Sequence, residues 1–271
     1  MENLSLHANE GPVNSGSSAS TSGGGGGGEW ADSEWELQRE EKWDDGGKGK
    51  KERTEELESC ESFEAMGLDD NILYAIYQYG FEKPSPIQRL AVKPIIQGRD
   101  VIAQAQAGQG KTGAFTLSIL QRIDTMMKKT QALVLVPTRV LADMHLEFMK
   151  AMGQRRGVNV TRCIGGTSMK EDKDAIRAGA HIVLGTPGRI AGLVEDGTLE
   201  LSDLRILVMD EADELLRDDG YDGGFREIVK WIIGRYESII FHNSHKTIEI
   251  NQTFLIYIYI YTYIFIIYGT D

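Results

Sequence analysis

Short apolar runs alternate with longer amphipathic stretches between about residues 62 and 231. Apolar residues spaced three and four positions apart predict helices, for example over Leu117–Met127 and Val140–Met152. The intervening apolar runs are typical of short buried strands. They lie at Val101–Ala103, Ala132–Val136, Val158–Ile164, His181–Leu184 and Arg205–Met209. Strands that alternate with helices indicate βαβ units, so we predict an α/β fold with a parallel sheet flanked by helices.

The N-terminal 60 residues lack this alternation. They combine a Ser-rich stretch, six consecutive glycines (Gly23–Gly28) and a charged segment with few aliphatic residues. Such a composition buries too little apolar surface to offset the entropy of ordering, so we predict a disordered tail over residues 1–60. Its tryptophans, Trp30, Trp35 and Trp43, are either scattered aromatics in that tail or a short partner-binding element.

The C-terminal segment is anomalous. Residues 254–268 read FLIYIYIYTYIFIIY and carry no charge. A membrane-spanning helix needs about 20 apolar residues, whereas this β-branched and aromatic run suits a strand and is an aggregation hazard. An in-frame TA repeat encodes alternating Tyr and Ile, so we hypothesise that residues 236–271 are translated non-coding sequence. An uninterrupted exon across that junction would exclude this origin. The predicted α/β domain then occupies residues 61–235.

Charge and cysteine content narrow the class of protein. The chain has 29 basic and 41 acidic residues, a net charge of −12, of which residues 1–60 contribute −8 through 14 acidic and 6 basic side chains. Nucleic acid cannot be bound by bulk charge here, so phosphate contacts must come from a local patch. Two cysteines, Cys60 and Cys163, form no disulfide framework or metal spacing. The N-terminus has no signal-peptide pattern, so we do not expect secretion. We expect a cytoplasmic or nuclear protein that does not bind a membrane.

A phosphate-binding loop is predicted at AQAQAGQGKT, residues 103–112, between a strand and a helix. Gly108 and Gly110 let backbone N–H groups wrap phosphates, and the helix N-terminus adds a favourable field. Lys111 would reach the β- and γ-phosphates, and the Thr112 hydroxyl would ligate Mg²⁺. The general pattern has glycine where Ala105 stands, so this motif alone leaves open an ordinary Gly/Gln-rich loop.

A second motif, Asp210-Glu211-Ala212-Asp213, follows the last predicted strand. Open α/β sheets bind their ligands at the carboxyl ends of strands. Asp210 would hold Mg²⁺ and Glu211 would polarise the attacking water. Four such residues alone also begin many solvated helices, but together with the phosphate loop they predict a nucleoside triphosphatase.

With GFEKPSPIQ at residues 80–88, these motifs resemble the first RecA-like domain of DEAD-box RNA helicases, nearest to the initiation factor four-A group. The resemblance covers about residues 60–233. It implies that Phe81 stacks on adenine and Gln88 bonds the base edge, which selects ATP, with Phe63 as a separate aromatic. The implied ATP site comprises Phe81, Gln88, Ala107, Gly108, Gln109, Gly110, Lys111, Thr112 and Gly113. The implied catalytic residues are Lys111, Asp210 and Glu211, and the implied metal ligands are Thr112 and Asp210.

Three further segments resemble the RNA-contacting motifs of that family: PTRVL at 137–141, Gly165-Gly166, and TPGR at 186–189. Each follows a predicted strand. Contacts to phosphate are independent of sequence, and contacts to the 2′-hydroxyl would favour RNA. The implied RNA-binding residues are Pro137, Thr138, Arg139, Gly166, Thr186, Pro187, Gly188 and Arg189. The family usually has Glu at Val140 and Ser or Thr at Ala107, and we expect these departures to tune the site without removing a phosphate or metal contact.

The resemblance implies an ATP-dependent RNA helicase that remodels RNA, as in translation initiation, together with protein partners. The Ser-Ala-Thr motif of the family and its second RecA-like domain are not in the sequence, and arginine fingers of the kind that domain supplies are worth about 10³–10⁵ in rate. Three interpretations therefore stay open: an active ATPase and helicase, a non-unwinding module that binds ATP, RNA or a partner, or an aberrant product without a role.

Overall fold

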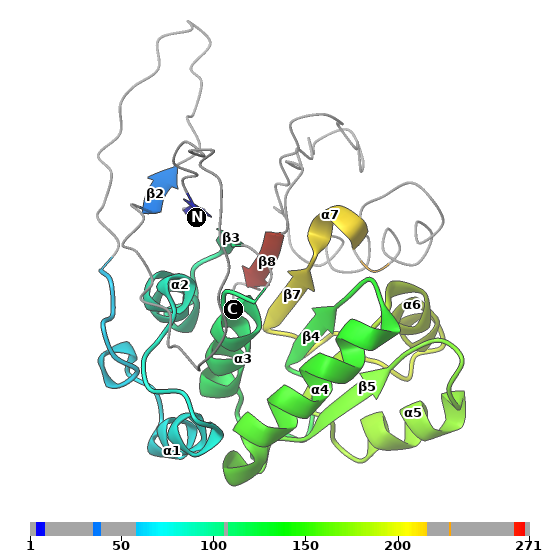
Figure 1. Ribbon diagram of the computed structural model, residues 1–271. Helices are drawn as coiled ribbons and strands as arrows, with labels where there is room; N and C mark the ends of the chain where they lie inside the picture. Colours follow the sequence, from blue (N-terminus) through cyan, green and yellow to red (C-terminus); the bar gives the residue numbers. More distant parts are fainter. Residues whose placement is uncertain are drawn as a thin grey trace, which may run out of the picture.

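The computed structural model describes residues 58–105, 108–215 and 228, together with three isolated strands at residues 4–8, 35–38 and 263–268. The strands form one sheet in the order β2-β1-β3-β8-β7-β4-β6-β5 (Figure 1). The helices are α1 Asp70–Tyr79, α2 Pro86–Ile96, α3 Lys111–Arg122, α4 Arg139–Gly153, α5 Met169–Arg177, α6 Pro187–Glu195 and α7 Ala212–Leu215. Two 3₁₀ turns lie at Glu64–Met66 and Gln154–Arg156.

Four neighbouring strands form the parallel core of the sheet. They are β7 (Ile206–Asp210), β4 (Ala132–Leu135), β6 (Ile182–Gly185) and β5 (Val160–Cys163). Leu133 of β4 pairs with Val183 on one side and Leu207 on the other, so the register is continuous across three strands. The predicted parallel α/β sheet is confirmed.

Both faces of this core are buried. In β4, Ala132 and Val134 belong to one apolar cluster, whereas Leu133 and Leu135 belong to a second. The first cluster includes residues of α1, α2, α3 and α4, and the second includes residues of α6 and α7. In Figure 1, α4 crosses in front of the sheet and α6 lies behind it. Because side chains alternate between the faces of a strand, a continuous apolar run is what a doubly covered strand requires.

The sheet extends beyond the predicted limits of the domain. Strand β8 (Tyr263–Tyr268) lies between β3 (Val101–Gln104) and β7, antiparallel to both. A strand was predicted in this Tyr/Ile-rich segment. On the other edge of β3, β1 (Leu4–Ala8) pairs in parallel and β2 (Trp35–Gln38) pairs with β1. The rest of residues 1–57 and 236–271, including Trp30 and Trp43, lies outside the described residues.

One helix boundary was predicted wrongly. The prediction over Val140–Met152 is confirmed by α4, but α3 begins at Lys111 and ends at Arg122, not at Met127. Beyond Ile123 the backbone groups are taken by side chains: the Asp124 carboxylate accepts the Met126 N–H at 3.0 Å. Such local hydrogen bonds compete with the helix ladder and stop it.

Both cysteine thiols are free and buried. Burial, together with the nearby Asp172 carboxylate, raises the pKa of Cys163 to about 12. Within the described part of the chain, no helix is long and apolar enough to cross a membrane.

The closest backbone approach between β5 and β6 gives a test of this packing. A Cβ at Gly185 would lie 2.0 Å from the carbonyl oxygen of Cys163, so G185A must push the strands apart. We expect a loss of roughly 1–3 kcal/mol in the free energy of unfolding, measured by chemical denaturation. G188A in α6 is the matched control, because the added Cβ meets nothing within 4 Å. Its free energy of unfolding should be unchanged or slightly higher. Equal stability of the two variants would contradict the strand packing.

Candidate nucleotide and RNA site

The predicted motifs gather at one edge of the sheet. The phosphate loop follows β3, and PTRVL follows β4. Gly165-Gly166 follows β5, TPGR follows β6, and Asp210 is the last residue of β7. Because β4, β5, β6 and β7 are parallel, and β3 runs with β7 through their shared antiparallel neighbour, all five carboxyl ends point the same way. This edge is where open α/β sheets bind ligands.

The phosphate loop has the backbone shape that its glycines predict. Gly108 and Gly110 have φ angles of +82° and +94°, in the left-handed region that glycine adopts without strain. Gly110 is the N-cap of α3, so Lys111 and Thr112 open the helix. The unpaired N–H groups of a helix start favour an anion there. Gln106 and Ala107, predicted parts of the loop, lie outside the described residues.

Lys111 is held within the site. It is only 8% exposed, and its Nζ donates to the carbonyl oxygen of Ala105. Burial lowers the pKa of this ammonium, while the charges of Asp210, Glu211 and Asp213 act against that shift. The lysine predicted to reach phosphate therefore lies close to the acidic motif at the end of β7.

The acidic motif concentrates negative charge. Burial, and then the neighbouring Asp210 and Asp213 carboxylates, raise the pKa of Glu211, and Lys111 opposes them. Glu211 has φ +51° and is the one non-glycine residue in the described part of the chain with a positive φ. Its N–H donates to Asp210 Oδ1 at 3.1 Å. Backbone strain of this kind tends to persist at functional sites.

The predicted metal ligands suit Mg²⁺. Thr112 and Asp210 offer oxygen donors, and Mg²⁺ is commonly bound by one or two carboxylates plus substrate phosphates and water. No cluster of three or more His, Cys, Asp or Glu side chains fit for a metal occurs among the described residues. After burial, the neighbouring carboxylates of Asp210 and Asp213 raise the pKa of Glu211, and a divalent cation would relieve this repulsion. The residues present therefore fit a magnesium ion carried in with a nucleotide.

Gln88 connects the predicted adenine-reading segment to the phosphate loop. Its Oε1 accepts the Ser85 N–H at 3.0 Å, and its Nε2 donates to the Gly110 carbonyl at 3.1 Å. Gln88 is 3% exposed, and its amide packs directly on Gly113 of α3. A Cβ added at Gly113 would lie 2.3 Å from Nε2. One amide hydrogen and one oxygen lone pair are left over for a base edge.

Phe81 is half-buried beside two other aromatic rings. It stacks on Tyr79 with centroids 5.5 Å apart and meets the edge of Phe148 from α4 at 6.1 Å. Phe63, predicted as a separate aromatic of the site, lies in the core at 1% exposure and contacts Tyr77 edge to face. Phe81 is thus the ring near the surface, and Phe63 is a packing residue.

Two of the predicted RNA-binding segments touch each other. A Cβ at Gly166, where φ is +85°, would lie 2.6 Å from Nη1 of Arg139. The Arg139 guanidinium therefore packs on the Gly165-Gly166 turn while the residue stays exposed. Thr138 caps α4 by accepting the Leu141 N–H at 3.2 Å, so its hydroxyl has a structural role as well.

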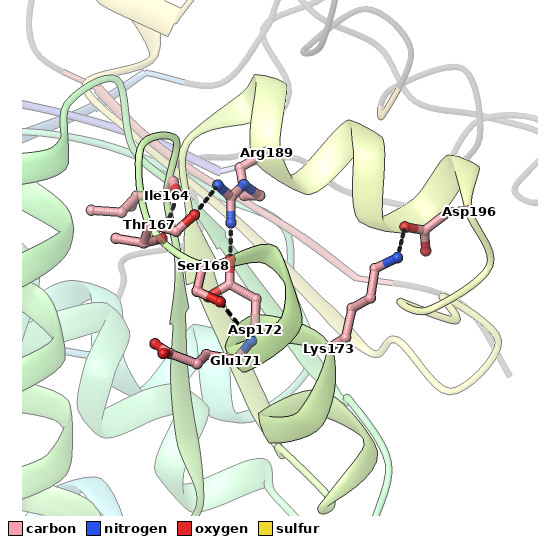
Figure 2. Close-up of polar contacts among 8 residues, drawn as sticks. All are labelled: Ile164, Thr167, Ser168, Glu171, Asp172, Lys173, Arg189 and Asp196. Carbon is pink, nitrogen blue, oxygen red and sulfur yellow. Dashed lines mark hydrogen bonds and ion pairs between the residues drawn. The ribbon is translucent and has the colours of Figure 1, made fainter.

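Arg189, also predicted to bind phosphate, is buried in an ion pair. Figure 2 shows its side chain pointing from α6 toward Asp172 of α5 and Thr167. Nη1 donates to the Asp172 carboxylate, Nη2 donates to the Thr167 carbonyl at 2.8 Å, and the two charged side chains are 9% and 8% exposed. A second pair, Lys173 with Asp196 at 2.7 Å, also joins α5 to α6. Arg189 therefore bonds to the residue after the turn on which Arg139 packs.

Of the other predicted RNA-binding residues, Pro137 and Pro187 are buried and Thr186 is the N-cap of α6, whereas Gly188 is exposed.

Two residues at the site were not predicted, His145 and Asp172. His145 lies 2.7 Å from Asp210, and its signal in the sequence is a polar residue on the apolar stripe of a helix. Asp172 has no such signal, since it is one of several acids in a charged helix.

A model of the DEAD/DEAH box helicase family matches residues 85–252 of the 271 in the chain. This match includes the phosphate loop, the RNA-site segments and Asp210-Glu211. The chain belongs to the DEAD/DEAH box helicase family. Members of this family bind ATP, which agrees with the phosphate loop seen here.

Related proteins resemble this chain in sequence over part of their length. The chain is 48% identical over 166 residues to eukaryotic initiation factor 4A-1 of Arabidopsis thaliana and 48% identical over 175 residues to the ATP-dependent RNA helicase FAL1 of Mycosarcoma maydis. These matches cover 60% and 63% of this chain but only 40% and 44% of the relatives. The chain thus spans less than half the length of these DEAD-box relatives.

Solved structures agree. S. cerevisiae Dbp5 bound to RNA and ADP BeF3 is similar with TM-score 0.59 and 32% identity, over 64% of this chain and 44% of Dbp5. A DEAD box protein from Methanococcus jannaschii is similar with TM-score 0.60 and 31% identity, over 64% of this chain and 47% of that protein. The shared fold is the α/β domain with the parallel sheet flanked by helices.

The buried ion pair of Arg189 gives a stability test in this DEAD-box domain. D172A leaves the guanidinium buried without its carboxylate, and breaking a buried pair costs about 3–5 kcal/mol. We expect a loss of that order in the free energy of unfolding, measured by urea denaturation. D174A is the matched control on the same helix, because Asp174 faces Arg177 at 3.9 Å on the surface and should cost under about 1 kcal/mol. Similar losses in both variants would show that the Arg189 pair is not buried.

Proposed function

We propose that this chain provides the ATP–Mg²⁺ and RNA-binding domain of a DEAD-box RNA helicase, in which ATP hydrolysis is coupled to RNA remodelling. The observation that carries the proposal is the placement of Lys111. This buried ammonium lies at the start of α3 and within the field of Asp210 and Glu211, at the carboxyl edge of the sheet. Burial disfavours the charged form of Lys111, and the charges of Asp210, Glu211 and Asp213 favour it. A charged group held in this way is more typical of a functional site than of a structural role.

Each polar group at this edge has a role in the proposed chemistry. The helix start at Gly110 and the Lys111 ammonium bind the β- and γ-phosphates. Thr112 and Asp210 would hold Mg²⁺, which would supply positive charge to neutralise the phosphates. Glu211, with its raised pKa, accepts a proton from the attacking water more readily than an ordinary carboxylate does.

Adenine would bind beside Phe81, whose ring is supported by Tyr79 and Phe148. The remaining donor and acceptor of the Gln88 amide suit the edge of adenine, which presents both kinds of group. Since the same amide bonds to Gly110, base and phosphate recognition are joined through one side chain.

RNA phosphates would bind at Arg139 and at the Gly165-Gly166 turn. Arg139 is exposed and packs on the turn, whereas Arg189, paired with Asp172, bonds to Thr167 just after the turn. The relative Dbp5 has been solved with RNA, which supports an RNA site in this chain. We therefore assign direct phosphate contact to Arg139 and a supporting role to Arg189.

A second candidate is a module that binds ATP and RNA without turnover. It is favoured by Asp213, whose buried Oδ1 has no hydrogen-bond partner among the described residues. One carboxylate oxygen of the acidic motif is therefore not fixed by any described group. RNA-stimulated release of phosphate by the purified chain, abolished in K111A, would exclude this module; ATP binding with no release would favour it.

The ATP site is tested by K111A. Hydrogen bonds to charged groups are worth about 1.5–3 kcal/mol, so ATP affinity in the presence of Mg²⁺ should fall roughly 10- to 100-fold. A fluorescent ATP analogue displaced by unlabelled ATP measures this. K129A removes an exposed lysine that pairs with Glu200 and should bind as the unmodified chain does. Equal affinity in K111A would refute the phosphate role of Lys111.

The RNA site is tested by the salt dependence of binding. R139A should weaken single-stranded RNA binding and reduce the slope of log K against log salt by about 0.7, the value for one phosphate contact. Fluorescence anisotropy with a labelled oligonucleotide, measured across salt concentrations, gives the slope. R155A is the control, because Arg155 lies past the other end of α4 and stacks 3.7 Å over Tyr74. An unchanged slope in R139A would remove Arg139 from the RNA site.

A further inference from the structure

His145 occupies a position in α4 where the helix is otherwise apolar. The buried side of α4 carries Ala142, His145, Met149 and Met152, spaced three and four residues apart. A polar ring in such a stripe needs a partner, because an unpaired buried donor is costly. The partner is not on α4 and comes from the sheet.

That partner is Asp210, the last residue of β7. Nε2 of His145 donates to Oδ2 of Asp210 at 2.7 Å, and both residues are 4% exposed. Asp210 Oδ1 accepts the Glu211 N–H, so each carboxylate oxygen has one fixed donor. Two donors from different elements leave the carboxylate a single orientation.

The imidazole is itself held in place. Phe115 of α3 meets it edge to face, with ring centroids 5.4 Å apart. Lys111 opens the same helix α3, and Arg139 opens α4. The ring thus lies where the phosphate-binding helix, the helix that begins at the RNA site and the strand of the acidic motif meet.

We infer that His145 is a positioning residue for the magnesium-binding carboxylate: its Nε2–H fixes Asp210 in the orientation that receives Mg²⁺–ATP. This inference rests on the proposed function. A histidine that only fills the core would need a partner too, but any buried acceptor would serve. Here the acceptor is the metal-binding residue, and outer contacts of this kind typically change metal affinity or activity by 10- to 100-fold.

The test measures nucleotide affinity of the full chain with Mg²⁺ and with EDTA, using a fluorescent ATP analogue, for three variants. H145L removes the donor, H145Q keeps an N–H near the position of Nε2, and H145N keeps a polar amide that is too short. We expect H145L and H145N to lose about tenfold or more in affinity with Mg²⁺ and almost nothing in EDTA. H145Q should recover most of the loss. M149L, on the same buried stripe, controls for packing and should match the unmodified chain.

The outcomes separate the possibilities. Equal Mg²⁺ dependence in all variants, or equal losses with and without Mg²⁺, would refute a positioning role and leave His145 a core residue. If H145L does not fold in a thermal melt, the H145Q and H145N pair still decides, since both are amides that differ in reach. If the unmodified chain binds no nucleotide with Mg²⁺, the proposed function is contradicted, and with it the inference about His145.

Discussion

The burial of parallel strands on both faces constrains the rest of this structure. Strands β7, β4 and β6 are covered on both faces, and β5 lies beside them at the edge of the sheet with its central residues partly buried. Every connection between these parallel strands must therefore leave the sheet and return in the same direction, here through a helix. All strand ends of one kind then meet at one edge. The carboxyl edge of an open α/β sheet is the place where such folds bind ligands. The phosphate loop, the acidic motif and the three RNA-site segments lie together for this reason.

Charge at that edge is balanced among neighbours. Burial disfavours both the Lys111 ammonium and the Glu211 carboxylate, and each partly offsets the penalty of the other. The Asp210 and Asp213 carboxylates add negative charge, which raises the pKa of Glu211, and the Lys111 ammonium acts against that rise. The strained backbone at Glu211 belongs to the same arrangement. A cation bound together with an anionic phosphate would offset charge of both signs here, which agrees with the proposed binding of ATP with Mg²⁺.

Helix α4 contacts three parts of the site. It begins at Arg139 against the Gly165-Gly166 turn, places His145 on Asp210, and ends its contacts with Phe148 against Phe81. One rigid helix thus joins the proposed RNA, metal and adenine contacts. The ion pair of Arg189 with Asp172 joins α6 to α5.

The sequence by itself determined the α/β class, the approximate strand positions within residues 61–235 and the two chemical motifs. Each depends on local pattern: apolar runs, glycines before Lys111, and an acid at the end of a strand. It did not predict β1 or β2, which lie in the segment predicted to be disordered. It placed α3 five residues too far at its C-terminal end, since hydrogen bonds of Asp124 and Gln131 compete with the helix there. Only the tertiary structure decided that Arg189 is buried by Asp172, that Gln88 bonds to Gly110, and that β8 lies between β3 and β7. It alone brought His145 to Asp210, 65 residues apart, because contacts between distant segments depend on how helices pack on the sheet and leave no periodic trace in the chain.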